Sequence, residues 1–212
     1  MSIPTARSRV GSMVQTGINR LLWLISRRGR LHGIATGVPW SDPERTIAAT
    51  KLRLALDLIH VALPRMLNRM KGDLAKILVT DVLIADGQFD PNLRMCMLDE
   101  SYVCKADVTP SHVATVLIHE ATHARLHAVG IGYPVSLRPR IERLCMRQEL
   151  ELAKQLPDGP RAALRAERGI NLPDSTWGQP ALVDRRIAVI RSWGWPEWIV
   201  RVIERTSRGR AA

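Results

Sequence analysis

The segment from Thr109 to Gly130 constrains the fold of this chain most strongly, because it carries helix start and stop signals around a helical apolar pattern. Thr109 is suited to cap a helix, and Pro110 fits the first helical position. Gly130 and Gly132 end the pattern, since glycine readily adopts the backbone conformation that closes a helix. The apolar residues between these signals are Val113, Val116, Leu117, Ala121 and Ala124. We therefore predict a helix over residues 110–128.

The predicted helix contains a His-Glu-x-x-His motif formed by His119, Glu120 and His123. Residues four apart lie on one face of a helix about one turn apart, so the two imidazoles can converge on one Zn²⁺. The glutamate after the first histidine is placed to take a proton from a water molecule at the metal. The motif therefore predicts His119 and His123 as zinc ligands and Glu120 as the general base.

In its helical context, the motif resembles that of the zincin metallopeptidases. The resemblance covers residues 109–153 most closely and implies zinc-dependent hydrolysis of peptide bonds, with Glu120 as the catalytic base. Arg125 departs from the family pattern, which prefers an apolar residue at that position. The metzincin branch of the family is not supported, because Leu126 and Val129 stand where its glycine bend and third histidine belong.

A catalytic zinc normally has three protein ligands and one open position, so a third ligand is needed. In the gluzincin branch it is a glutamate of the following helix, and Glu142 and Glu149 are the candidates in a helix that we predict over 141–156. Eighteen residues separate His123 from Glu142, close to the short gluzincin spacing, and an antiparallel pair of helices would bring them level. We favour Glu142 as the ligand and Glu149 as a partner that orients His119.

Two alternatives for the third ligand stay open. Residues 149–153 resemble a segment of another gluzincin branch in which the first glutamate binds the metal, although Ala153 stands where that branch has an aspartate. Cys145 lies on the same helical face as the two glutamates, and a thiolate also binds zinc. His127 lies about 12 Å along the helix axis from His119, too far to share the ion, so we expect it to be structural or close to the substrate.

The residues before the metal-binding helix predict an antiparallel hairpin. Lys76–Ala85 and Leu93–Leu98 are rich in strand-forming residues, and Asp86-Gly87 begins a turn between them. In zincins a small sheet covers the active-site helix and its edge strand binds an extended substrate, so the resemblance implies that 93–98 is this edge. The expected fold class is α+β, mostly helical and zincin-like. Candidates to stabilise the transition state are Tyr133, Tyr102 and His127.

Proline, glycine and acidic residues bound the other predicted helices. One helix begins at Asp42 and ends before Pro64, a short one covers 161–168, and an amphipathic one begins near Pro180. The length of 212 residues favours one domain with additions. We expect a basic N-terminal arm over 1–40, a gluzincin-like core over 41–160, and a C-terminal helical extension over 161–212 that packs on the core.

Positive charge is concentrated near the two ends of the sequence. The formal net charge is +11, yet residues 41–200 hold 21 basic and 19 acidic residues. Residues 1–40 hold six arginines and no acid, and residues 201–212 hold four arginines and one acid. A nucleic-acid binder should carry its excess charge on the folded body, so nucleic acid is not the expected partner. The basic ends instead suit contact with an anionic membrane surface or an acidic protein.

The alternative to a peptidase is a non-enzymatic binding module, with a vestigial zinc or no metal. It would dock on a membrane, an acidic protein or nucleic acid through its basic ends and the tryptophans Trp193, Trp195 and Trp198. The three cysteines form no Cys-x-x-Cys pair, which favours a reducing compartment. No apolar run reaches the roughly 18–20 residues that span a bilayer. We therefore expect a cytoplasmic protein with a peptide or protein substrate and no integral membrane span.

Overall fold

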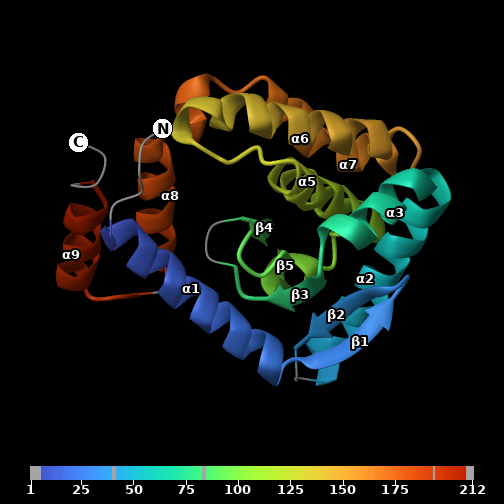
Figure 1. Cartoon of the computed structure of the whole chain (residues 1–212), viewed down its shortest axis with the longest axis horizontal. Helices are drawn as coiled ribbons and strands as arrows, with labels where there is room; N and C mark the ends of the chain where they lie inside the picture. The colour runs from blue at the N-terminus through green and yellow to red at the C-terminus, as the bar shows by residue number, and fades with distance from the viewer. Residues whose placement is uncertain (1–5, 40–41, 83–84, 193, 209–212) are drawn as a thin grey trace.

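The computed structural model describes residues 6–39, 42–82, 85–192 and 194–208, and these form a mostly helical α+β fold around a five-stranded sheet (Figure 1). The elements follow in the order α1 (Ala6–Ile25), β1 (Arg27–Leu31), β2 (Ile34–Val38), α2 (Asp42–Ala62), α3 (Pro64–Asp73), β3 (Lys76–Thr80), β4 (Gly87–Asp90), β5 (Met95–Asp99), α4 (Glu100–Cys104), α5 (Pro110–Ala128), η1 (Val135–Leu137), α6 (Arg138–Ala153), α7 (Gly159–Ile170), η2 (Asp174–Trp177), α8 (Gln179–Ser192) and α9 (Glu197–Arg208). The expected mostly helical α+β class is therefore confirmed, but the expected small antiparallel sheet is instead a five-stranded mixed sheet.

The sheet is mixed, with the strand order β1-β2-β3-β5-β4. β1 and β2 form an antiparallel hairpin, and β2 runs parallel to β3 after a crossover through α2 and α3. Such a helical crossover is what two parallel neighbours require. β3 and β5 are also parallel, with Lys76 opposite Met95 and Thr80 opposite Asp99. β4 completes the sheet as an antiparallel neighbour of β5, with Gly87 opposite Leu98.

The predicted hairpin between residues 76–85 and 93–98 is wrong in its pairing. β3 runs parallel to β5, and the hairpin is formed by β4 and β5, whose turn is closed by the Asp90 carboxylate as it accepts the backbone N–H groups of Asn92 and Leu93. Because β5 lies between β3 and β4, it cannot be the substrate-binding edge; among the described strands β4 occupies that edge. Residues 83–84 of the predicted strand lie outside the described residues.

The predicted N-terminal arm contributes two strands to the sheet, β1 and β2. His32 and Gly33 join them with φ angles of 48° and 86°, the pair of positive values that a tight antiparallel hairpin needs. Ile34 and Val38 of β2 are buried in the core. The part of the predicted arm at residues 1–5 and 40 lies outside the described residues.

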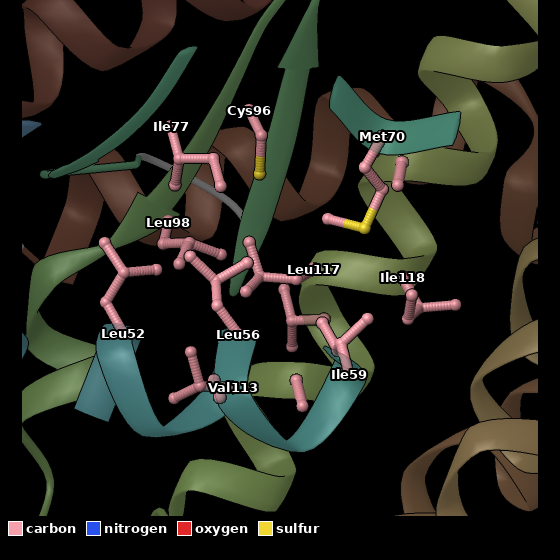
Figure 2. Packing of buried hydrophobic residues seen from close by; sticks show 14 of the residues in the cluster. Leu52, Leu56, Ile59, Met70, Ile77, Cys96, Leu98, Val113, Leu117 and Ile118 are labelled. Carbon is pink, nitrogen blue, oxygen red and sulfur yellow. The ribbon is translucent and has the colours of Figure 1, made fainter. Parts of the chain in front are cut away.

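The two faces of the sheet bury different clusters because side chains alternate along a strand. One face packs on α2, α3 and α5; its strand residues are Ile34, Val38, Ile77, Val79, Cys96 and Leu98. Figure 2 shows Leu52, Leu56 and Ile59 of α2 beside Val113 and Leu117 of α5 in this cluster. The other face, with Leu78, Met95 and Met97, packs on Leu22 and Trp23 of α1. The helix that carries the metal motif is thus fixed against the sheet along its apolar side.

The remaining helices extend the fold away from the sheet. The predicted helix over 110–128 is confirmed as α5, whereas the predicted 141–156 helix begins three residues earlier, at Arg138, and ends at Ala153. α6 packs on α5, and α7 packs along α6 (Figure 1). α8 packs on α9 and on η2. None of the helices formed by the described residues is long and apolar enough to cross a membrane.

Candidate metal centre

The two histidines of the motif lie on the side of α5 that faces α6. His119 is buried and His123 is half-buried, and their Nε2 atoms are 3.2 Å apart. The i, i+4 spacing on a regular helix places the two rings one above the other. Both Nε2 atoms therefore point to one location, as a shared metal ion would require.

Glu142 of α6 completes a triangle with these two nitrogens. Its Oε2 lies 3.3 Å from Nε2 of His119, and its Oε1 lies 3.5 Å from Nε2 of His123. Ligand atoms held 2.0–2.1 Å from a tetrahedral Zn²⁺ are separated by about 3.3–3.4 Å. The donor set of two imidazoles and one carboxylate is one that catalytic zinc uses, so these residues fit the ion in both spacing and chemistry.

Glu149, about two turns further along the same face of α6, contacts the other ring nitrogen of His119. Its Oε1 lies 2.5 Å from Nδ1 of His119, and its Oε2 accepts a 2.8 Å hydrogen bond from Nη2 of Arg165 on α7. Arg165 also donates to Asp86, just before β4, over 3.0 Å. Such a carboxylate behind a ligating histidine fixes its ring orientation and tautomer. The structure therefore puts Glu142 and Glu149 on opposite nitrogens of His119.

The two carboxylates that contact His119 favour positive charge on its ring. Burial disfavours the charged imidazole, but hydrogen bonds to Glu142 and Glu149 outweigh it and raise the pKa of His119 to about 10. Burial would raise the pKa of Glu142, yet the hydrogen bond with His119 and the nearby histidines lower it to about 2. Burial and the neighbouring His119 lower the pKa of His123 to about 4. The two carboxylates thus stabilise a positive charge on His119, which a metal would replace with its own, and the low pKa of His123 leaves that ring unprotonated.

Glu120 is buried between α5 and the edge of the sheet. Burial raises the pKa of its carboxyl group to about 7, partly opposed by the neighbouring His119. The opposing strand β4 begins at Gly87, where an added Cβ would lie 2.7 Å from Cγ1 of Val116 and 3.1 Å from Cγ of Glu120. Glycine therefore allows β4 to approach the motif helix closely, and it brings the edge strand next to Glu120.

Cys145 is a second candidate for the third ligand. The ligand atoms of His119, His123 and Cys145 all lie within 4.8 Å of one another, and Cys145 is fully buried on α6. Burial, reinforced by the nearby Glu142, raises the pKa of the thiol, so it is uncharged until a metal displaces its proton. Glu142 is ionised, and its oxygens lie 3.3 and 3.5 Å from the two histidine nitrogens, so we favour it as the third ligand.

The three candidates for transition-state stabilisation lie in different places. The Tyr133 hydroxyl donates a hydrogen bond to Oε1 of Glu142, and the Tyr133 ring packs edge-on against His123 with the centroids 5.2 Å apart. His127 is exposed and its ring packs against Phe89 of β4 instead. Tyr102 lines a cavity of about 490 Å³ between α4, α5 and α7, together with Arg165. Only Tyr133 therefore contacts the histidine–glutamate cluster.

The departure from the zincin pattern at Arg125 has a local explanation. Arg125 is exposed, and its Nη1 lies 3.6 Å from Oδ1 of Asp73 at the end of α3. An apolar residue is unnecessary at this position, because the helix surface there faces solvent and an acidic partner. Arg125 therefore does not disturb the cluster.

Sequence reasoning missed Arg165, Asp86 and Gly87 as parts of the site. Arg165 lies 16 residues from Glu149 and 79 residues from Asp86 in the sequence, and no local pattern links the three. The sequence predicts that Asp86-Gly87 begins a turn, which is a common role for this pair. One signal could have led to Arg165: a buried carboxylate such as Glu149 needs a positively charged partner besides the histidine.

Comparison with models of known protein families finds no match to this chain. Comparisons with curated proteins and with solved structures find no match either. The functional argument therefore depends on the geometry and chemistry of the site itself.

Proposed function

We propose that this protein is a zinc-dependent metallopeptidase of gluzincin type. The observation that carries the proposal is the set of donor atoms from His119, His123 and Glu142, which are separated by 3.2–3.5 Å. The carboxylate of Glu149 on Nδ1 of His119 supports it, because catalytic zinc sites commonly use such a partner. In this proposal Cys145 stays an uncharged neighbour of the metal.

The catalytic work of the chain itself falls to Glu120 and Tyr133. Bound zinc would act as a Lewis acid towards the scissile carbonyl and lower the pKa of a water molecule. The Glu120 carboxylate would accept a proton from the attacking water and pass it to the leaving amine, a role suited to a buried carboxyl whose pKa is about 7. The Tyr133 hydroxyl, beside Glu142, would donate to the oxygen on which negative charge develops.

The proposed substrate is an extended peptide that pairs with β4. This strand is at the edge of the sheet formed by the described residues, and it starts beside Glu120 at Gly87. Main-chain hydrogen bonds to an edge strand bind a peptide with little dependence on its side chains. The proposed substrate-binding edge strand is thus β4, in place of residues 93–98.

Metal content is the first test. Purified wild-type protein should hold one equivalent of zinc by elemental analysis, and His119→Ala and Glu142→Gln should lose most of it. His127→Ala is the matched control, because His127 lies on the same helix outside the cluster and should not affect zinc content. Loss of zinc in Cys145→Ser with full retention in Glu142→Gln would assign the third ligand to the thiolate. A metal-free wild-type protein would exclude the peptidase and favour a binding module.

Hydrolysis is the second test. Glu120→Gln should keep its zinc and lose cleavage of a library of quenched fluorescent peptides by at least about a hundredfold, because the general base is removed. Glu151→Gln, an exposed glutamate on α6 paired with Lys154, is the control and should cleave normally. Unchanged cleavage in zinc-loaded Glu120→Gln would refute the assigned mechanism.

A further inference from the structure

Helix α1 is attached to the sheet by one side only. Leu22 and Trp23 pack on the sheet face opposite to α5, and Asn19 donates a buried hydrogen bond of 2.7 Å to Asp90 at the end of β4. Ser26 is also buried on this inner side. These contacts fix the position of the helix, and they leave its opposite side facing away from the fold (Figure 1).

The outer side of α1 is apolar, contrary to the pattern of a surface helix. Its large side chains are exposed as follows: Ile18 47%, Leu21 58%, Leu24 63% and Ile25 52%. At 100° per residue these four positions fall within one arc of about 120°. A surface helix normally places polar residues there, and a contiguous exposed apolar patch marks an interaction site. We call these four residues the outer face of α1.

The residues that flank this outer face in the sequence are basic. Arg20 is exposed beside it, and the helix leads directly into β1, where Arg27, Arg28 and Arg30 are exposed. The sequence has no aspartate or glutamate before Asp42. The partner of this surface must therefore combine an apolar interior with negative charge.

We propose that the outer face of α1 together with Arg28 and Arg30 of β1 docks the protein on an anionic membrane surface. A bilayer containing anionic lipids offers hydrocarbon for the four apolar side chains and headgroup charge for the arginines. A second copy of the chain is the poorer fit, because a two-fold contact through the same surface would bring arginine close to arginine. The proposal is independent of the metal centre, which lies on the opposite side of the sheet.

Vesicle sedimentation tests the apolar part. The full chain should sediment with vesicles of phosphatidylcholine and phosphatidylserine and stay in solution with phosphatidylcholine alone. Leu21→Ser/Leu24→Ser should weaken binding by more than about tenfold, because each substitution removes apolar side-chain area that the membrane would bury. Val61→Ser is the control: Val61 is 81% exposed on α2, which covers the other face of the sheet, and its loss should leave binding unchanged.

The charge part has its own matched pair of variants. Arg28→Gln/Arg30→Gln should weaken binding by about tenfold or more, because pairing with Gly37 and Ala35 puts both arginines on the sheet face that carries α1. Arg65→Gln/Arg69→Gln on α3 removes the same charge elsewhere and should have a much smaller effect. His119→Ala should bind vesicles like the wild type, so failure of the peptidase proposal would not affect this result. Wild-type protein that ignores anionic vesicles, or that instead dimerises or binds only an acidic protein, overturns the proposal. Thermal unfolding of each variant checks that it is folded.

Discussion

At the scale of single residues, Glu149 determines how His119 faces the proposed metal position. Its carboxylate is almost fully buried, and Arg165 compensates its charge on the far side from His119. A buried carboxylate with one partner on each oxygen has little freedom to move. The ring of His119 is therefore held with Nε2 towards His123 and Glu142 before any metal binds, which lowers the ordering cost of binding.

Glu149→Gln should weaken zinc binding by about 10–100-fold without unfolding the protein, because the neutral amide holds the imidazole less firmly and makes it a weaker ligand. Competition with a zinc chelator measures the change in affinity. Glu151→Gln, two residues further along α6, is exposed and should have the affinity of the wild type. Equal zinc affinity in the wild type and Glu149→Gln would contradict the positioning role of Glu149.

Gly87 is required by close packing between β4 and α5. Gly87→Ala should destabilise the fold by about 1–3 kcal/mol, since its Cβ would overlap Val116 and crowd Glu120. It should also reduce peptide cleavage more than zinc content, because the residue displaced is the proposed base and not a ligand. Chemical denaturation and elemental analysis provide the two readouts. Gly72→Ala, where an added Cβ has no neighbour within 4 Å, should be nearly neutral; similar losses in both variants would count against the packing argument.

At the scale of secondary-structure elements, the pair α5 and α6 assembles the centre, and the turn after α6 ties back to the start of α5. Asp158, between α6 and α7, accepts a hydrogen bond from the hydroxyl of Thr109, the residue that caps α5. Burial disfavours the ionised carboxylate, but hydrogen bonds from Ser111 and Thr109 outweigh it and lower the pKa of Asp158. The ionised form therefore stabilises the native arrangement of the two helices.

Asp158→Asn should reduce the free energy of unfolding by about 1 kcal/mol at neutral pH, a value that allows for the partial exposure of Asp158. Because its native pKa is below the unfolded value, this stability is present above about pH 4 and is lost as the pH falls through the native pKa. Urea denaturation of both proteins at several pH values measures the difference. A difference that persists undiminished at low pH would show that the charge of Asp158 is not its source.

The elements also show which features local sequence can predict. The bounds of α5 follow from Thr109, Pro110 and Gly130, since capping and backbone preferences act within one turn. β4 escaped prediction because it is four residues long and lies between two turn-forming segments. The parallel pairing of β3 and β5 depends on the tertiary contacts of distant elements, which no local pattern encodes. The spacing from His123 predicted that Glu142 lies nearby. The contact of Arg165 with Glu149 could not be predicted, because it depends on how α7 packs on α6.

At the scale of the whole molecule, buried apolar residues are distributed unequally. The main cluster joins α2, α3 and α5 to the sheet, whereas the hairpin of α8 and α9 has a small cluster of its own, formed by Val183, Ile187, Ile190 and Val200. Of the predicted C-terminal extension, α7 packs firmly on α6, but α8 packs mainly on η2 and α9. Trp195 and Trp198 are exposed, and Trp193 lies outside the described residues. The predicted tryptophan contact surface therefore remains a prediction.

Because local stability follows the amount of buried apolar contact, α8 and α9 should open more readily than the rest of the molecule. Native-state hydrogen exchange should show amides of these helices exchanging at least about tenfold faster than those of α5 and β3. Zinc bound at α5 and α6 should slow exchange further in those two helices, because an opening there must release the ion and becomes less favourable. Exchange in α8 and α9 should not change, because their opening does not release the ion. Equal protection throughout the chain would instead mean that the hairpin unfolds together with the core, as one cooperative unit.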